Sequence, residues 1–420
     1  MKILSLDDLP WEDLPQKKRR VFLRADFNVP IQSGEVLDDF RIKQVIPTIE
    51  NLLQRGAVVV IGTHLGRPQK LGLDKRSKLS LLPVAERLTQ LMNRDLIFSE
   101  ESLGSGVRKL IQDSKPGETV ILLENLRFYE GEEANDSSFA EKLFENCDVY
   151  VNDAFGASHR AHASIDAITR YARLRAAGFL LSKEYQVLEQ VLSSPKKPQM
   201  AVLGGAKIED KIQVIERLID SCSEIFIGGR MGLSFLAAKG VSLGATKLES
   251  SAIQMAKRIL ADAKKKSVQI HYPQDARVAQ AIDAKDCRIK LIDQIDASEG
   301  VFDLGPQTME VWKSHLKNAK SIVWNGPLGV FENPVFAHST LELVDFLVEK
   351  NTDIQSVVGG GETVAAVTQR EALEKLYHVS TGGGAMLELI EGRNLPGIEA
   401  LKLRDREVAE LKQFVSLKYT

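Results

Sequence analysis

The sequence predicts an α/β fold in two domains, each built on a mainly parallel sheet flanked by helices. Short apolar runs alternate with amphipathic helical patterns along the chain, which is the pattern of βαβ units. These runs are continuously apolar, as expected for strands that helices cover on both faces. At 420 residues the chain also exceeds the length at which a single hydrophobic core usually stops growing.

Ten runs are expected to form strands. The first half contains RVFLRADF, AVVVIGT, TVILLE and CDVYVND, and the second half contains MAVLGG, EIFIGG, SVQIHYP, SIVWNGP, SVVGGG and YHVSTGG. One open sheet of ten or more strands would be unusual. We therefore expect a separate sheet in each half.

The boundary between the domains is expected at residues 182–198, SKEYQVLEQVLSSPKKP. Its apolar residues Tyr185, Leu188, Val191 and Leu192 lie on one face of a helix that would end at SSP. This helix would link an N-terminal domain, residues 1–181, to a second domain, residues 199–401, and a hinge is expected within 176–198. Residues 402–420 also have helical spacing, which does not decide the domain that they contact.

The composition excludes several classes of protein. Lys and Arg total 55 against 57 Asp and Glu, whereas a nucleic-acid binder normally has a basic excess. The dense basic run KKRR, residues 17–20, is interpreted as a solvated segment. Three cysteines without CxxC spacing argue against a disulfide framework or a zinc site. The acidic N-terminus and the lack of ~18 consecutive apolar residues favour a cytoplasmic protein without a membrane partner.

Basic and polar residues follow the predicted strands of the first half, where ligands bind in open α/β sheets. They are Arg24, Asp26 and Asn28; His64 and Arg67; Arg127; and His159, Arg160 and His162. A guanidinium group offers a planar fork of donors to carboxylate or phosphate. Each Arg alone would more often be a surface ion pair, but four at four strand ends favour a site for a small, multiply charged anion. Arg41 stands apart at the head of a predicted helix, where it could instead pair with Asp38 or Asp39.

Glycine turns follow the predicted strands of the second half: LGGAKIEDKI, IGGRMGLSF, WNGPLGVFE, VGGGETVAAV and STGGGAMLEL. Glycines let a phosphate chain approach the backbone, and helix N-termini present unpaired N–H groups. The P-loop and the GxGxxG fingerprint are both absent, so a nucleotide bed of another kind is expected. Lys207 and Lys211 would share a face if a helix begins by residue 207, either as a phosphate site or as a surface pair.

An anion site in one domain and a phosphate site in the other indicate group transfer, and phosphoryl transfer is the natural candidate. Such transfer needs in-line positioning, Mg²⁺ and cationic donors more than covalent help from the protein. The sequence has no GxSxG elbow or recognisable Cys–His arrangement, so direct transfer without a phosphoenzyme is favoured. Exclusion of water would require the domains to close on both ligands.

Taken together, the motifs RADFNVP, THLGRP, LLENLRF, NDAFGASHRAHAS, GGAKIEDKI, WNGPLGVFE, GGGETVAAV and STGGGAMLELIEGRNLPGIEAL resemble the phosphoglycerate kinase family. The resemblance runs from about residue 20 to residue 401, in the family's order. It implies two Rossmann-like domains joined by a hinge helix, with phosphoglycerate bound by the first domain and Mg-nucleotide by the second. It also implies a monomer whose chain end, residues 402–420, returns to the first domain, and reversible transfer between 1,3-bisphosphoglycerate and ADP.

The resemblance also assigns site residues motif by motif. Phosphoglycerate would be held by Asp26, Phe27, Asn28, Arg41, His64, Leu65, Gly66, Arg67, Arg127 and Arg160. The nucleotide would be held by Lys207, Lys211, Asn325, Gly359, Gly360, Gly361 and Thr363, with Glu332 at the ribose and Gly305 and the IGGRMG turn at the adenine. Arg41, Lys207 and Lys211 would be the catalytic residues, and Glu362 would serve the Mg²⁺ of the nucleotide.

The chain departs from the family pattern at a few positions. Arg230 lies beside the expected adenine pocket, and Met386 stands where a serine is common. Most consequential is Glu362, where the family usually has an aspartate. Its carboxylate is one methylene further from the backbone, although Mg²⁺ demands near-ideal geometry. A non-catalytic protein that closes on a ligand therefore stays open as an alternative, whereas a nicotinamide-dependent enzyme is disfavoured by the absent GxGxxG.

Overall fold

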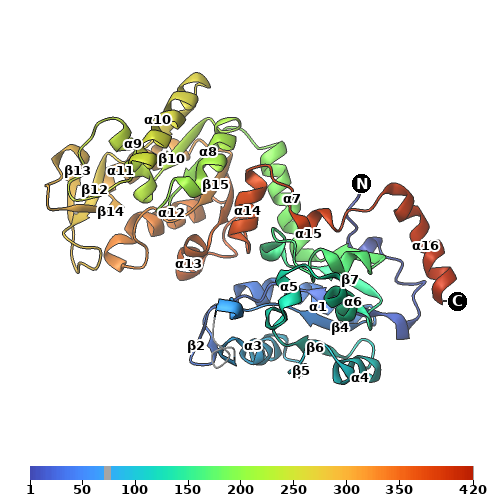
Figure 1. Ribbon diagram of the computed structural model, residues 1–420. Coiled ribbons are helices and arrows are strands. Elements are labelled where there is room, and N and C mark those ends of the chain that lie inside the picture. Colours follow the sequence, from blue (N-terminus) through green and yellow to red (C-terminus); the bar gives the residue numbers. More distant parts are fainter. Residues whose placement is uncertain (71–76, 420) are drawn as a thin grey trace. The chain divides into compact units, whose positions relative to one another are not determined.

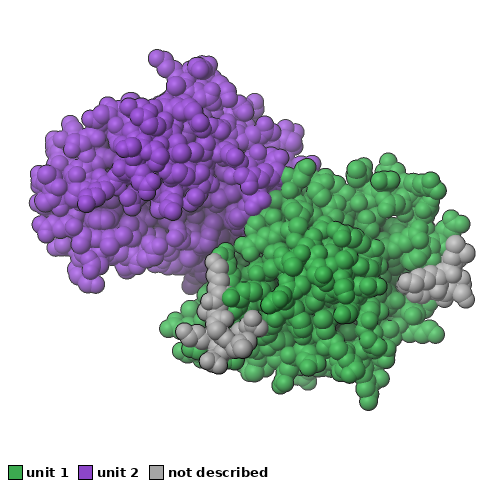
Figure 2. Space-filling view, in the orientation of Figure 1, with its two compact units in different colours: residues 1–186, 394–420 green, residues 187–393 purple. Residues whose placement is uncertain are grey.

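The computed structural model describes residues 1–70 and 77–419 and divides into two compact units. Unit 1 comprises residues 1–186 and 394–420, and unit 2 comprises residues 187–393 (Figure 2). Each unit contains a six-stranded sheet in which neighbouring strands pair in parallel (Figure 1). The predicted α/β class with two mainly parallel sheets is confirmed.

The sheet of unit 1 has the strand order β5-β6-β4-β1-β7-β8. Its strands are β1 (Arg20–Arg24), β4 (Val58–Gly62), β5 (Ile97–Ser99), β6 (Val120–Leu123), β7 (Val149–Asn152) and β8 (Leu174–Ala177). The four central strands are the four that the apolar runs predict, and they are almost entirely buried. The prediction missed the two edge strands, because neither is a continuous apolar run: β5 is partly exposed and ends in a serine, and β8 contains Arg175.

Helices surround this sheet and complete its core. They are α1 (Phe40–Gln54), α3 (Leu82–Met92), α4 (Ser105–Asp113), α5 (Glu130–Glu133), α6 (Ser137–Phe144), α15 (Pro396–Glu399) and α16 (Asp405–Tyr419). Helix α1 buries Ile42, Val45, Ile49 and Leu52, which share one face, against the sheet. A small hairpin, β2 (Ile31–Gln32) and β3 (Glu35–Val36), lies between β1 and α1 in the sequence.

The sheet of unit 2 has the strand order β11-β10-β9-β15-β16-β17. Its strands are β9 (Gln199–Leu203), β10 (Glu224–Ile227), β11 (Gln269–His271), β15 (Ser321–Asn325), β16 (Gln355–Gly359) and β17 (His378–Val379). All six correspond to predicted runs. Its helices are α8 (Ile212–Ile219), α9 (Gly229–Ala238), α10 (Ser250–Lys265), α11 (Pro306–Leu316), α12 (His338–Glu349), α13 (Gly361–Gln369) and α14 (Gly383–Ile390).

Unit 2 also contains an antiparallel sheet that the sequence did not predict. It consists of β12 (Asp275–Ala279), β13 (Arg288–Leu291) and β14 (Gly300–Leu304), in the order β13-β12-β14. Ala276 and Val278 of this sheet pack with Leu233 and Leu236 of α9 in a small separate core. The outer strand β13 is mostly exposed, so its sequence lacks the continuous apolar run that marks the parallel strands.

Helix α7 (Phe179–Ser193) connects the two units, as the apolar spacing of residues 182–198 predicts. At its beginning, Phe179 N donates to Thr48 Oγ1 (3.0 Å) and Leu181 N donates to Asp153 Oδ1 (3.0 Å), all within unit 1. Near its end, Gln199 Nε2 donates to Val191 O (2.9 Å) within unit 2. The boundary between the units falls inside this helix, after Gln186.

The return of the chain to unit 1 differs from the expected position. The expectation placed residues up to 401 in the second domain, but unit 1 already resumes at Asn394. The reason is that Gly397 approaches β7 of unit 1: its N–H donates to Ser158 O (2.8 Å), and its carbonyl accepts from Asn152 Nδ2 (3.4 Å). Residues Leu403, Leu411 and Val415 then join the core of unit 1. In the described part of the chain, no helix is both long and apolar enough to span a membrane.

Candidate active site

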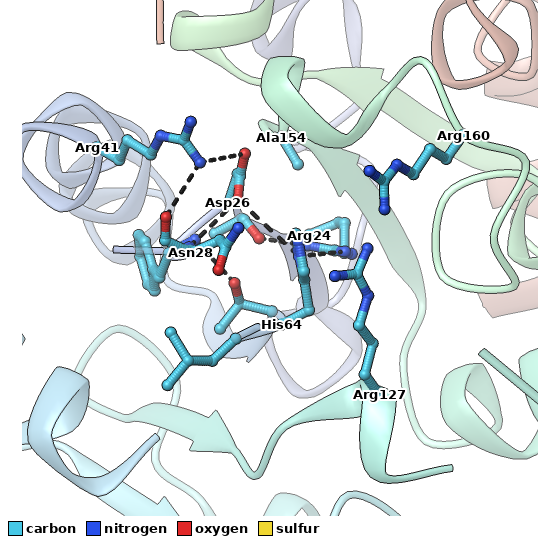
Figure 3. A network of polar contacts seen from close by, with 12 residues as sticks. Arg24, Asp26, Asn28, Arg41, His64, Arg127, Ala154 and Arg160 are labelled. Carbon is cyan, nitrogen blue, oxygen red and sulfur yellow. Dashed lines mark hydrogen bonds and ion pairs between the residues drawn. The ribbon is translucent and has the colours of Figure 1, made fainter. Parts of the chain in front are cut away.

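Four neighbouring strands of unit 1 deliver the predicted anion-binding residues to one edge of the sheet. In the order β6-β4-β1-β7, the segments after the strands carry Arg127, His64, Asp26 and Arg160. Because all four strands are parallel, their carboxyl ends meet at the same edge. Figure 3 shows these side chains grouped around a common space.

Arg24 lies at the centre of the group and is fully buried. Its Nη2 lies 3.2 Å from His64 Nδ1, and its Nε donates to Ser164 Oγ (2.7 Å). Glu132 completes the network: its Oε1 accepts from Ser164 Oγ (2.6 Å) and lies 3.8 Å from Arg24 Nη2. Arg24 therefore holds His64 and Ser164 in place from the buried side of the site, and its ion pair with Glu132 compensates its charge.

Asp26 and Asn28 position Arg41 and the loop after β4. Arg41 Nη1 donates to Asp26 Oδ2 and to Asn28 O, both at 3.2 Å (Figure 3). Gly66 N donates to Asn28 Oδ1 (2.9 Å). Arg41 thus pairs with Asp26 rather than with Asp38 or Asp39, the partners considered from the sequence, and its half-exposed guanidinium keeps donors free for a ligand.

Asn125 and Arg127 fasten the same loop from β6. Asn125 exchanges hydrogen bonds with the backbone of Leu65, and Arg127 Nη1 donates to Gly66 O (2.6 Å). Arg127 Nε and Glu133 Oε1 form an ion pair at 3.1 Å, but their geometry is not that of a hydrogen bond, so Nε has no hydrogen-bond partner. The loop is therefore tied to three strands before any ligand binds, which reduces the entropic cost of binding.

The electrostatics of this edge favour an anion. Burial lowers the pKa of Arg127 to about 10, the Glu133 carboxylate opposes this shift, and Arg160 and Arg24 add to it. Burial, Arg24 and Arg127 also hold the pKa of His64 well below its usual range, and they lower that of His162 to about 3. Both imidazoles are therefore neutral at pH 7. Repulsion among the guanidinium groups is relieved when a carboxylate or phosphate enters.

The structure places the remaining residues of the predicted anion site less centrally. Phe27 and Leu65 are buried, and their contributions are the backbone bonds from Phe27 N to Thr63 Oγ1 (2.9 Å) and from Leu65 N to Asn125 Oδ1 (3.2 Å). Arg67 is exposed, and Arg160 is half-buried with its Nε donating to His159 Nε2 (3.0 Å). The prediction missed Glu132, Ser164 and Asn125, because nothing in their local sequence distinguishes them from surface polar residues.

Two adjoining cavities lie at the carboxyl edge of the large sheet in unit 2. The first, of about 520 Å³, is lined largely by apolar residues and includes Leu233, Val301, Leu304, Leu328 and Val330. The second, of about 510 Å³, is lined by Lys207, Lys211, Asn325, Gly360, Gly361 and Thr363. Gly205, Ala206, Pro327 and Glu362 border both cavities. One elongated ligand with an apolar end and an anionic end would fit the pair.

Lys211 reaches the second cavity in a way that the sequence did not predict. Helix α8 begins at Ile212, after a 3-10 turn over Glu209–Lys211, so the condition for Lys207 and Lys211 to share a helix face is not met. The backbone after β9 is instead hydrogen-bonded to the end of β15 and the turn after it, from Gly204 N to Asn325 O (3.0 Å) and from Gly205 N to Pro327 O (2.9 Å). Lys211 Nζ donates to Gly204 O (2.6 Å) and Asn325 O (3.2 Å) at this place. Burial lowers the pKa of Lys211 to about 8, against the raising effect of Glu362. Lys207 is exposed.

The turn before α13 forms the opposite wall of this cavity. Gly360 has φ +108°, a conformation that favours glycine, and it directs the chain into the helix at Gly361. Asn325 Nδ2 donates to Gly359 O (2.8 Å), and Gly326 N donates to Thr363 Oγ1 (2.8 Å). The free N–H groups at the start of α13 therefore face a cavity that also contains Lys211.

Two glycines of the predicted nucleotide site do not line either cavity. A side chain at Gly359 would collide with Met386 Sδ, and one at Gly305 would collide with the carboxylate of Asp275. Close packing against these neighbours is therefore what requires glycine at both positions, and Leu304 lines the first cavity in place of Gly305. Arg230 does line it, and its Nη2 donates to Lys247 O (2.6 Å).

Glu362 borders both cavities at the beginning of α13. Partial burial raises its pKa, the nearby negative charge of Glu332 adds to this effect, and Lys211 opposes it. Glu332 lines the first cavity. A carboxylate beside another carboxylate, at the border of a cavity suited to phosphates, is a donor set that a hard cation such as Mg²⁺ prefers.

Comparisons with known proteins agree on one family. The family model described as phosphoglycerate kinase matches residues 11–393. The phosphoglycerate kinase of Geobacter metallireducens is 41% identical over 404 residues, which cover 96% of this chain and 99% of that protein. The solved structure of phosphoglycerate kinase from Coxiella burnetii superimposes with a TM-score of 0.81 at 35% identity, covering 95% of this chain and 99% of that one.

A second solved structure, phosphoglycerate kinase from Pyrococcus horikoshii, gives a TM-score of 0.79 at 32% identity and covers 96% of this chain and 99% of that one. The family model, the sequence relatives and the solved structures each extend over both units. The chain belongs to the phosphoglycerate kinase family.

Proposed function

We propose that this kinase catalyses reversible transfer of a phosphoryl group between 1,3-bisphosphoglycerate and ADP, giving 3-phosphoglycerate and ATP, in glycolysis and gluconeogenesis. The acceptor in the reverse direction is the carboxylate of 3-phosphoglycerate. The reaction is proposed to depend on Mg²⁺ bound with the nucleotide.

The pair of adjoining cavities in unit 2 is the observation that carries this proposal. Adenine and ribose fit the apolar cavity, where Glu332 can accept hydrogen bonds from ribose hydroxyls. The phosphate chain fits the second cavity, beside Lys207, Lys211 and the start of α13. The anion site of unit 1 suits phosphoglycerate, since its carboxylate and phosphate match Arg127, Arg160 and the free donors of Arg41.

The roles of the residues follow from their charges and positions. Lys211, which keeps an ammonium on a flexible stem, would follow the phosphoryl group as charge moves, and Arg41 would stabilise the transferred group from unit 1. Glu362 would hold the Mg²⁺, which supplies neutralisation of the phosphate charges when bound. We further propose direct in-line transfer, with closure of the units about α7 to exclude water.

A coupled assay with ATP, Mg²⁺ and 3-phosphoglycerate tests the function, and no turnover would refute it. Retained binding of both ligands without turnover would instead support the non-catalytic alternative. Arg41→Ala should lower kcat by about 10³-fold or more, the range seen for arginines that stabilise transferring phosphoryl groups. Arg87→Ala is the matched control, because Arg87 pairs with Asp39 outside the site (2.6 Å). Equal kcat in the Arg41 variant and the wild type would contradict its role.

Cytoplasmic location, a monomeric state and the absence of nucleic-acid partners stay predictions from the sequence. They follow from composition and from the family resemblance. Size-exclusion chromatography with light scattering would test the monomeric state directly.

A further inference from the structure

Three side chains of unit 2 converge away from the cavities described above: Glu224, His271 and His315. Glu224 Oε2 lies 2.6 Å from His271 Nε2 and 2.8 Å from His315 Nδ1. One ligand atom from each of the three residues lies within 4.8 Å of the other two. The carboxylate and the two imidazoles therefore point at one small volume.

The fold brings these residues together from three elements. Glu224 begins β10, and its neighbour on the same face, Phe226, is paired with His271 at the end of β11. Helix α11 covers this face and contributes Trp312 and His315, which lie three residues apart and so share a side of the helix. The triad is thus assembled by strand register and helix docking, not by sequence spacing.

Aromatic packing holds the imidazole rings in place. His271 stacks on Phe226 with ring centroids 4.3 Å apart, and Trp312 contacts the same phenyl ring edge-on at 5.3 Å. The rings of His271 and His315 meet at 4.6 Å and 60°. Rings fixed in this way have already lost the rotamer freedom that ligand binding would otherwise remove.

The chemistry of the cluster favours a metal ion over a simple hydrogen-bonded group. In the described residues no Lys or Arg pairs with the Glu224 carboxylate, and the ion-pair contacts that it makes are with the two imidazoles. The side chain of His315 is 36% exposed, which leaves a path for an ion from solvent.

We propose that Glu224, His271 and His315 form a binding site for one divalent first-row transition-metal ion, with Zn²⁺ as its simplest occupant. Two imidazole nitrogens and one carboxylate oxygen are an established donor set for a tetrahedral ion that keeps a fourth position for water. Tetrahedral ligands at about 2.0–2.1 Å lie roughly 3.3 Å apart. The 2.6 Å contact of Glu224 with His271 must therefore open by roughly 0.7 Å and the 2.8 Å contact with His315 by roughly 0.5 Å. Rotation of the Glu224 side chain can open the first contact, and His315, in the last turn of α11, can move to open the second.

The site is separate from the nucleotide cavities of the same unit. Glu224 occupies the amino end of β10, whereas Gly229, which follows the carboxyl end, lines the first cavity. Metal binding should therefore stabilise unit 2 without competing with the Mg-nucleotide, and the inference does not depend on the proposed reaction.

Isothermal titration of the chelator-treated full chain with ZnCl₂ tests the proposal. The wild type should bind one Zn²⁺ at the cluster, and saturating Mg-ADP should leave that affinity unchanged. His315→Ala and Glu224→Gln should each weaken it by about 100-fold or more, because even changes outside the ligand shell cost about 10- to 100-fold. His338→Ala, a change at an exposed histidine of α12, should have no effect. Circular dichroism without metal confirms that each variant is folded.

A measurement on the wild type makes the test independent of the variants. X-ray absorption of the 1:1 zinc complex should show only nitrogen and oxygen ligands at about 2.0–2.1 Å with two imidazoles, and a thermal melt should move to higher temperature with added Zn²⁺. Sulfur at about 2.3 Å would place the ion on a cysteine and overturn the proposal. The absence of a 1:1 complex, or undiminished affinity in both variants, would overturn it as well.

Discussion

Lys211 illustrates at the scale of one residue how the fold prepares a charge for a ligand. Its ammonium donates to two backbone carbonyls, and burial has lowered its pKa to about 8. A buried ammonium whose hydrogen-bond partners are neutral carbonyls is costly, and an incoming phosphate relieves that cost. The sequence places a lysine after a glycine turn, but only the pairing of that turn with the end of β15 brings the two carbonyls of Gly204 and Asn325 to its ammonium.

The pH dependence of kcat/KM for Mg-ATP should therefore have an alkaline limb. The charged form is required, so kcat/KM should fall as the pH rises through about 8, the pKa of Lys211 in the free enzyme. Lys211→Arg should be slower but should lose this limb, because arginine stays protonated. Lys207→Arg, at the exposed lysine of the same loop, should keep the limb. If the alkaline limb of kcat/KM persists unchanged in Lys211→Arg, the limb belongs to the titration of another group.

Glu362 is the second residue whose identity decides a property of the site. Glu362→Gln removes the negative charge proposed to hold Mg²⁺ and should weaken Mg-ADP binding by about tenfold, with little change for ADP without Mg²⁺. Glu362→Asp keeps the charge on a shorter arm and should bind Mg-ADP at least as tightly as the wild type. Calorimetric titrations with and without Mg²⁺ measure both. Equal losses for ADP and Mg-ADP would show that Glu362 acts on the nucleotide rather than on the ion.

Helix α7 shows at the scale of an element how one helix is held by two units. Its beginning is anchored by Asp153, a buried carboxylate that accepts from Leu181 N (3.0 Å) and whose Oδ2 has no hydrogen-bond partner. Burial raises the pKa of Asp153 to about 7, although Thr48 and two backbone N–H groups oppose the shift. The helix start is thus most stable when this carboxyl group is protonated.

Asp153→Asn should remove a pH dependence from the stability of unit 1. The folded pKa is about 7 against 3.8 for the free group, so the contribution of Asp153 is fully present below pH 3.8 and is lost as the pH rises through about 7. As the pH rises from 3.8 to about 7, the free energy of unfolding of the variant should increase by a few kcal/mol relative to that of the wild type. The reason is that one unit of pKa is worth about 1.4 kcal/mol. Urea unfolding at pH 5 and pH 8 measures this gain. A constant difference between the two proteins would contradict the raised pKa.

Unit 1 is discontinuous at the scale of the whole molecule, because residues 394–420 return to it after the chain has built unit 2. Leu403, Leu411 and Val415 enter its core beside Leu4, Leu6 and Leu174. The stability of unit 1 therefore depends on both ends of the chain, whereas unit 2 is one continuous segment.

Leu411→Ala should destabilise unit 1 by about 2–5 kcal/mol and leave unit 2 unchanged, because the lost methyl groups come from the core of unit 1 alone. The tryptophans separate the two transitions: Trp11 lies in unit 1, and Trp312 and Trp324 lie in unit 2. Urea unfolding is followed by the tryptophan signal in variants that retain either Trp11 alone or Trp312 and Trp324 alone, so that the stability of each unit is measured separately. Val408→Ala, at a less buried position of α16, is the matched control and should cost less. If Leu411→Ala lowers the free energy of unfolding equally in both units, the two units unfold together and the prediction is wrong.

The sequence by itself determined the two parallel sheets, ten of their twelve strands, the linking helix and the residues at the strand ends. These features depend on local patterns: continuous apolar runs mark strands buried on both faces, and parallel strands must present their ends at one edge. The resemblance to the family rests on the same strand-end motifs, and Lys211 and Thr363, which it assigns to the nucleotide, line one cavity of unit 2.

Only the tertiary structure decided which neighbours each residue has. Glu132 and Ser164 support Arg24 from segments more than a hundred residues away in the chain, and the Glu224, His271 and His315 cluster joins three elements whose local sequences contain no metal motif. Gly359 and Gly305 proved to be sites of close packing rather than cavity walls. Local sequence fixes which face of a strand or helix a side chain occupies, but contacts between distant segments depend on the register and docking of whole elements.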